Sequence, residues 1–82
     1  MPAAPQVIVY VSRHCPACRQ LSSELVECCR GSGVEPEVRD VLAELEAAAR
    51  LGVSQPPAVV IDGRLFGQGA AVLRKLKLRF AA

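Results

Sequence analysis

Alternating apolar and polar stretches divide the chain into short strand-like runs and longer helix-like runs. The first run, residues 7–11 (Val-Ile-Val-Tyr-Val), is β-branched and aromatic, which favours a buried strand. From about Cys15 to Arg30 the apolar positions recur at helical spacing. The inner stripe of this predicted helix is Cys18, Leu21, Leu25 and Cys28. Glycines at 31 and 33 follow, and they favour a helix end there.

The middle of the chain predicts a second strand and a second helix. The strand is expected from Val34 to Arg39, and Asp40 is a plausible N-cap for the helix that follows. Gly52 is expected to end this helix. Its inner face is predicted to carry Leu42, Leu45, Ala48 or Ala49, and Leu51.

Two prolines and a compact apolar run mark the next strand. Pro56 and Pro57 cannot join a helix interior or a central strand ladder, so this segment must be extended or turned. Residues 58–61 then form a buried strand, and Asp-Gly at 62–63 predicts a hairpin turn to a fourth strand over 64–66. Gly67-Gln68-Gly69 opens the last helix, with its inner side chains at Val72, Leu73, Leu76 and Phe80.

The predicted order is therefore β-α-β-α-β-β-α, within a single domain that spans residues 1–82. A right-handed crossover makes the first two strands parallel, and the hairpin makes the last two antiparallel. The fold class is α/β, with a mixed four-stranded sheet and helices on both faces.

Composition narrows the classes of function. A hydrophobic content of 51% supports a packed core, and a net charge of +2 is too small to indicate a nucleic-acid or membrane partner. No apolar stretch is long enough to span a bilayer, and residues 1–5 lack the basic start of a secretory signal. Four cysteines without such a signal indicate a reducing, cytoplasmic location, and we expect a monomer.

Cys15-Pro16-Ala17-Cys18 carries the candidate chemistry, because it lies where the first strand passes into the first helix. Unpaired N–H groups and the positive end of the helix dipole favour a thiolate at Cys15. Arg13 and His14 add nearby positive charge. Cys18, one helical turn on, can reach back to close a disulfide. The spacing predicts dithiol–disulfide redox chemistry.

The whole pattern resembles a glutaredoxin-like member of the thioredoxin superfamily. The resemblance rests on CPxC after the first strand and on the later segment 55–63, QPPAVVIDG. It implies a thioredoxin/glutaredoxin fold and a thiol-disulfide oxidoreductase that reduces or exchanges protein or low-molecular-weight disulfides. In that family Cys15 would be the exposed nucleophile and Cys18 the resolving thiol. Pro57 would be the cis-proline that faces them.

The same resemblance implies a substrate-binding region around the cysteines. It includes Arg13, His14, Pro56 and Pro57, together with Gly67 and Gly69, where backbone N–H groups would bind the γ-glutamyl carboxylate of glutathione. This chain departs from the family pattern at three places. Ser12 replaces the usual basic residue, Gln68 stands in a Gly-Gln-Gly with no acidic residue after it, and Pro56 offers a C=O but no N–H. No tryptophan is present, so the Trp-Cys-Gly-Pro-Cys signature of conventional thioredoxins is missing.

We expect that this cycle requires no cofactor. Glutathione is one candidate for the co-substrate. The reductant could be glutathione or a thioredoxin-reductase type of system. Two alternatives use the thiols to hold metal: a Cu(I) or Zn carrier, or an iron–sulfur carrier that binds its cluster through Cys15 and glutathione. Copper chaperones usually have Met where Arg13 stands and follow a β-α-β-β-α-β order.

Two further cysteines, Cys28 and Cys29, are interpreted as small apolar residues of the first helix. Cys28 lies ~15 Å along the helix axis from Cys18, so the two cannot ligate one ion. No metal ligand is assigned.

Overall fold

The computed structural model describes residues 5–13 and 16–80, and it describes the side chains of 5–13 and 18–80. The predicted order of elements is confirmed, with one 3₁₀ helix added. The elements are β1 (Val7–Val11), α1 (Pro16–Gly31), β2 (Glu37–Asp40), the 3₁₀ helix η1 (Val41–Glu44), α2 (Leu45–Leu51), β3 (Ala58–Ile61), β4 (Arg64–Gln68) and α3 (Val72–Phe80). Within the described part of the chain, none of the helices is long and apolar enough to cross a membrane.

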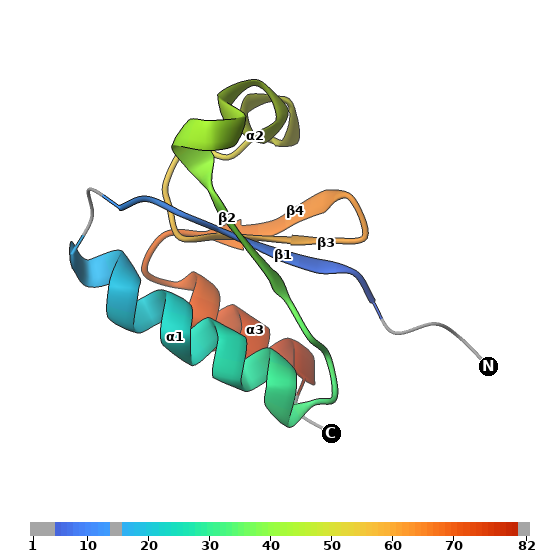
Figure 1. Ribbon diagram of the computed structural model, residues 1–82. Coiled ribbons are helices and arrows are strands. Elements are labelled where there is room, and N and C mark those ends of the chain that lie inside the picture. The colour runs from blue at the N-terminus through green and yellow to red at the C-terminus, as the bar shows by residue number, and fades with distance from the viewer. Residues whose placement is uncertain (1–4, 14–15, 81–82) are drawn as a thin grey trace.

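The four strands form one mixed sheet in the order β2-β1-β3-β4. β1 pairs with β2 in parallel and with β3 antiparallel, and β3 pairs with β4 antiparallel. Helices α1 and α3 lie side by side on one face of this sheet, and α2 lies on the other (Figure 1). The mixed sheet with helices on both faces is therefore confirmed.

A separate core cluster fills each face, because side chains of the central strands alternate between the two. On the α1/α3 face the buried residues are Val7, Val9, Leu25, Cys29, Val34, Val59, Val72 and Leu76. On the α2 face they are Tyr10, Ala48, Ala58 and Val60. Burial on both faces explains why β1 and β3 are continuous apolar runs.

At one end of the sheet, β1 is fastened to the β3–β4 hairpin. The N–H of Gln6 donates to Oδ1 of Asp62, and the N–H of Asp62 donates to the carbonyl of Gln6, both at 2.9 Å. Asp62 has a φ of 50° and Gly63 a φ of 80°, as a tight Asp-Gly turn requires.

The second strand begins at Glu37, not at Val34 as predicted. The N–H of Val34 donates instead to the carbonyl of Cys29 at 2.9 Å and so completes the C-terminus of α1. Pro36 then has no N–H to donate to a strand ladder. The strand is consequently shorter than its apolar pattern suggests.

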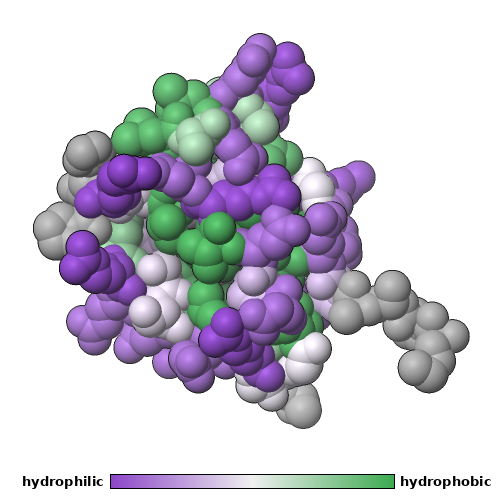
Figure 2. All heavy atoms as spheres, in the orientation of Figure 1, coloured by the Kyte–Doolittle hydropathy of each residue, from purple (hydrophilic) through white to green (hydrophobic). Residues whose placement is uncertain are grey.

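The expected inner face of the second helix is corrected by the structure. Asp40 is an N-cap as predicted, but of the 3₁₀ helix η1 that precedes α2, and its Oδ1 accepts the N–H of Leu42 at 2.9 Å. The cap leads into the 3₁₀ helix η1, whose tighter turn changes which side chains meet the sheet. Leu42 and Leu45 are 47% and 60% exposed, so these two predictions are wrong, whereas Ala48 is buried and Leu51 packs against the same cluster, as predicted. Apolar side chains accordingly gather at the surface above α2 (Figure 2).

Two smaller corrections concern α1 and α3. Of the adjacent pair Cys28 and Cys29, it is Cys29 that is fully buried. Helix α3 begins at Val72, since Gly67 and Gln68 extend β4.

Candidate functional site

One end of the sheet brings together the two segments that the sequence singles out. β1 ends at Val11, and α1 begins at Pro16, a residue suited to a first helical turn. In the antiparallel register of β1 and β3, Tyr10 lies opposite Ala58. Pro57 therefore precedes β3 beside the end of β1. The start of α1 and the double proline thus share one end of the molecule.

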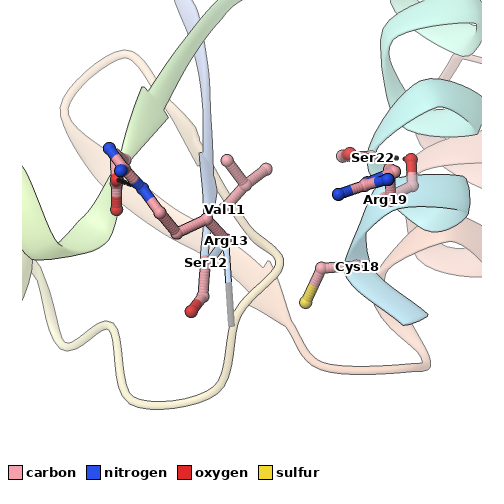
Figure 3. Close-up of a pocket in the computed structure, with 7 residues that line it drawn as sticks. Val11, Ser12, Arg13, Cys18, Arg19 and Ser22 are labelled. Atoms are coloured by element: carbon pink, nitrogen blue, oxygen red, sulfur yellow. Dashed lines mark hydrogen bonds and ion pairs between the residues drawn. The ribbon is translucent and has the colours of Figure 1, made fainter. Parts of the chain in front are cut away.

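Cys18 lies in the first turn of α1 and is 1% exposed. Its sulfur points into a cleft of about 360 Å³ (Figure 3). The cleft is lined by Val11, Ser12, Arg13, Cys18, Arg19, Ser22 and Asp40. Such burial fits a thiol that is reached from within the molecule rather than by a bulky substrate. The predicted nucleophile, Cys15, and its neighbour His14 lie outside the described residues.

Charged groups from the segment after β1, from the end of β2 and from α1 line this cleft. Nε of Arg13 donates to Oδ2 of Asp40 at 3.1 Å. The parallel register places Asp40 next to Val11, at the shared carboxyl end of the two strands. The positive charge of Arg13 is thus partly offset, whereas the sequence had treated it as acting on Cys15 alone. Asp40 and Arg19 are cleft residues that the sequence analysis did not assign.

The Pro56–Pro57 peptide bond is cis, which confirms the prediction made for Pro57. Pro57 is buried, and Pro56 is partly exposed. Pro56 therefore presents a carbonyl, but no N–H, next to the cis bond. A substrate backbone that pairs with this segment can donate an N–H to the Pro56 carbonyl, but Pro56 has no N–H to donate in return.

Gln68 holds the segment that leads into the double proline. Its Oε1 accepts the N–H groups of Ser54 and Gln55, at 2.7 and 2.9 Å. Its Nε2 donates to the carbonyl of Gly52 at 3.2 Å. One side-chain amide of β4 thereby satisfies three backbone groups of the loop. Sequence reasoning missed this role, and the only signal is a glutamine set between two glycines.

The two glycines predicted to bind an anion do not form a helix N-terminus. The N–H of Gly69 donates to the carbonyls of Gln55 and Pro57, both at 2.9 Å. Gly67 lies within β4, opposite Val59, and a Cβ there would approach Cγ2 of Val72 to 3.1 Å. Gly69 is therefore occupied within the fold, and Gly67 allows the close approach of α3.

The family of the chain follows from its match to known proteins. A family model for the thioredoxin domain matches residues 6–79. The chain belongs to the thioredoxin-domain family. The predicted superfamily and thioredoxin fold are thereby confirmed, and the chain is a small redox protein of that superfamily. The element order also differs from the β-α-β-β-α-β order expected of a copper chaperone.

Solved thioredoxins share this fold at low sequence identity. Thioredoxin 1 of the thermophilic eubacterium Thermosipho africanus is 16% identical, with a TM-score of 0.69 over 90% of this chain and 92% of its own. Oxidised thioredoxin from Plasmodium falciparum is 18% identical, with a TM-score of 0.67 over 95% and 82%. Thioredoxin from Fasciola hepatica is 23% identical, with a TM-score of 0.67 over 94% and 81%. No curated protein matches the sequence.

Proposed function

We propose that this thioredoxin-domain protein is a thiol-disulfide oxidoreductase that cycles between a Cys15–Cys18 dithiol and a disulfide. The observation that carries the proposal is the buried Cys18 sulfur in a cleft at the start of α1. Cys15 precedes it by three residues, and the cis-proline segment lies at the same end of the sheet. Two thiols in this arrangement need no metal or organic cofactor.

In the proposed cycle, the Cys15 thiolate attacks one sulfur of a substrate disulfide and expels the other as a thiolate. The Cys18 thiolate then attacks the Cys15 sulfur and expels the remaining substrate thiolate. The protein is left with a Cys15–Cys18 disulfide, and the substrate has gained two electrons and, once its thiolates are protonated, two protons. A thiol or dithiol reductant returns the protein to its starting state.

We further propose a reductant of the thioredoxin-reductase type, with glutathione as the second option. Glutaredoxin-like use of glutathione would need backbone donors near the cis-proline and before the last helix. Pro56 has no N–H, and the N–H of Gly69 is donated to Gln55 and Pro57. These two features weaken the site that glutathione would occupy.

Trapping of the mixed disulfide tests the cycle. Cys18→Ser keeps the attacking thiol but removes the resolving one, so we expect a covalent adduct with a disulfide substrate, detected by mass spectrometry. Cys15→Ser should form no adduct and should lose at least about a hundredfold of the turnover rate, because the nucleophile is absent. Cys28→Ser, which alters a thiol outside the cleft, is the control and should behave as wild type. Undiminished turnover by Cys15→Ser would refute the cycle.

The reductant is tested by coupled turnover. The protein is supplied either with thioredoxin reductase or with glutathione and glutathione reductase, and consumption of the nicotinamide cofactor is followed. We expect faster turnover with thioredoxin reductase. Faster turnover with glutathione would contradict this part of the proposal and would favour the glutaredoxin-like subtype.

A further inference from the structure

The cleft that contains Cys18 has an arginine on each of two walls. Arg13 follows β1, and Arg19 belongs to α1 directly after Cys18 (Figure 3). Asp40 is the only carboxylate that lines the cleft among the described residues. Two positive groups against one negative group leave the described lining with a positive balance.

Each arginine is placed so that it can bind a further group. Arg13 contacts Asp40 through Nε, and its side chain is 77% exposed, so it remains accessible to a ligand. Arg19 is exposed, and within the described residues it forms no salt bridge. Three other arginines, by contrast, pair with glutamates: Arg30, Arg39 and Arg50.

A guanidinium group recognises a carboxylate through two parallel N–H···O bonds. We expect a small disulfide that reacts with the Cys15–Cys18 pair to bring the groups next to its sulfur to the cleft that Cys18 lines. Resting on the proposed function, we propose that Arg19, assisted by Arg13, forms an anion subsite that selects disulfides with a carboxylate within a few bonds of the sulfur. Arg19 acts here as a specificity-determining residue.

Because the cleft is open to water, the selectivity is expected to be modest and sensitive to salt. A single exposed ion pair changes a rate or affinity by about two- to fivefold, and bidentate geometry adds to this. The effect is therefore measured as the ratio of the reaction rates of an anionic and a cationic disulfide. A positive subsite raises the first rate and lowers the second, so the ratio changes more than either rate alone.

The test uses three small disulfides of similar size: dithiodipropionate, which is anionic; hydroxyethyl disulfide, which is neutral; and cystamine, which is cationic. Fully reduced protein is mixed with each, the reaction is quenched with acid, and the oxidised fraction is measured by mass spectrometry. This single-turnover format needs no reductase. It also avoids a tryptophan fluorescence readout, which this chain cannot give because it has no tryptophan.

The readout is the ratio of the anionic to the cationic rate. Arg19→Gln should lower this ratio by about three- to tenfold relative to wild type at low salt. Arg19→Lys should retain most of it, because it keeps the charge. The leaving thiols differ in pKa, but they are the same for every variant, so the change of ratio isolates Arg19. High salt should shrink the difference between wild type and Arg19→Gln.

Arg74→Gln is the matched control, because it removes an equal charge from an exposed position of α3 outside the cleft lining. It should leave the ratio at its wild-type value. An unchanged ratio in Arg19→Gln, or an equal drop in Arg74→Gln, would overturn the proposed subsite. The proposed function would still stand in that case, provided that the neutral disulfide is reduced. Failure of wild type to reduce any of the three disulfides would instead refute the proposed function, and the subsite with it.

Discussion

Cys28 and Cys29 are adjacent in α1 but lie in different surroundings. Cys28 is half-buried and borders a groove of about 410 Å³ that also contains Lys77. Cys29 is fully buried in the core between the sheet and the helices. Burial, and secondarily the nearby Cys28 thiolate, raises the pKa of Cys29 from 9.0 to about 11. Cys29 is therefore a neutral core residue at physiological pH.

This raised pKa predicts a loss of stability at alkaline pH. Between about pH 9 and about pH 11 the Cys29 thiol is ionised in the unfolded chain but still protonated in the folded one. The folded state then binds more protons, so its stability falls as pH rises. By pH 11 wild type should lose about 2 kcal/mol more than Cys29→Ala does. Urea unfolding followed by circular dichroism measures both. Equal pH slopes for the two proteins would contradict the assignment.

At the scale of elements, Gln68 couples β4 to the loop that ends in the cis-proline. Gln68→Ala removes its three hydrogen bonds and should cost about 2 kcal/mol of stability. It should also lower kcat/KM for disulfide reduction, because the loop that positions the Pro56 carbonyl is no longer held by hydrogen bonds from Gln68. Alkylation of Cys15, which needs no docked substrate backbone, should keep its wild-type rate.

Two further variants make the Gln68 prediction specific. Gln68→Glu keeps the two acceptor contacts but loses the donor to Gly52, so its kcat/KM should lie between wild type and Gln68→Ala. Gln20→Ala, at an exposed position of α1, should match wild type. If Gln68→Ala and Gln20→Ala reduce disulfides equally well, the loop does not depend on Gln68.

The elements that the sequence predicted well are those fixed by local chemistry. β1 and β3 were predicted with their observed bounds because each is an apolar run buried on both faces. Elements set by neighbours were predicted less well. Val34 looked like a strand residue, yet its N–H completes α1. Leu45 looked like an inner residue, yet the preceding 3₁₀ turn directs it to solvent.

The same division applies to the candidate site. Cys18 at the start of a helix could be predicted from motif spacing, and the cis bond at Pro57 from the resemblance to the family. Arg19, Asp40 and Gln68 could not, because their roles depend on the strand register and on contacts between distant segments. A sequence pattern identifies reactive side chains more readily than the residues that surround them.

At the scale of the whole molecule, two leucines of α3 show how far the stability of this 82-residue chain depends on its core. Leu76 is 0% exposed and Leu78 is 71% exposed, two residues apart in one helix. Leu76→Ala should lower the free energy of unfolding by about 2–5 kcal/mol, a large share of the total for a small domain. Leu78→Ala should change it by less than about 0.5 kcal/mol. Urea denaturation measures both, and equal losses would contradict the described packing.

The hydrogen bonds between Gln6 and Asp62 lie at the opposite end of β1 from Cys18. The five residues of β1 separate the two ends by roughly 16 Å. A cargo protein or a solid support coupled ahead of Gln6 would thus be attached at the rear of the domain. Immobilised in that orientation, the protein should leave the mouth of its cleft pointing outward, toward disulfides arriving from solution.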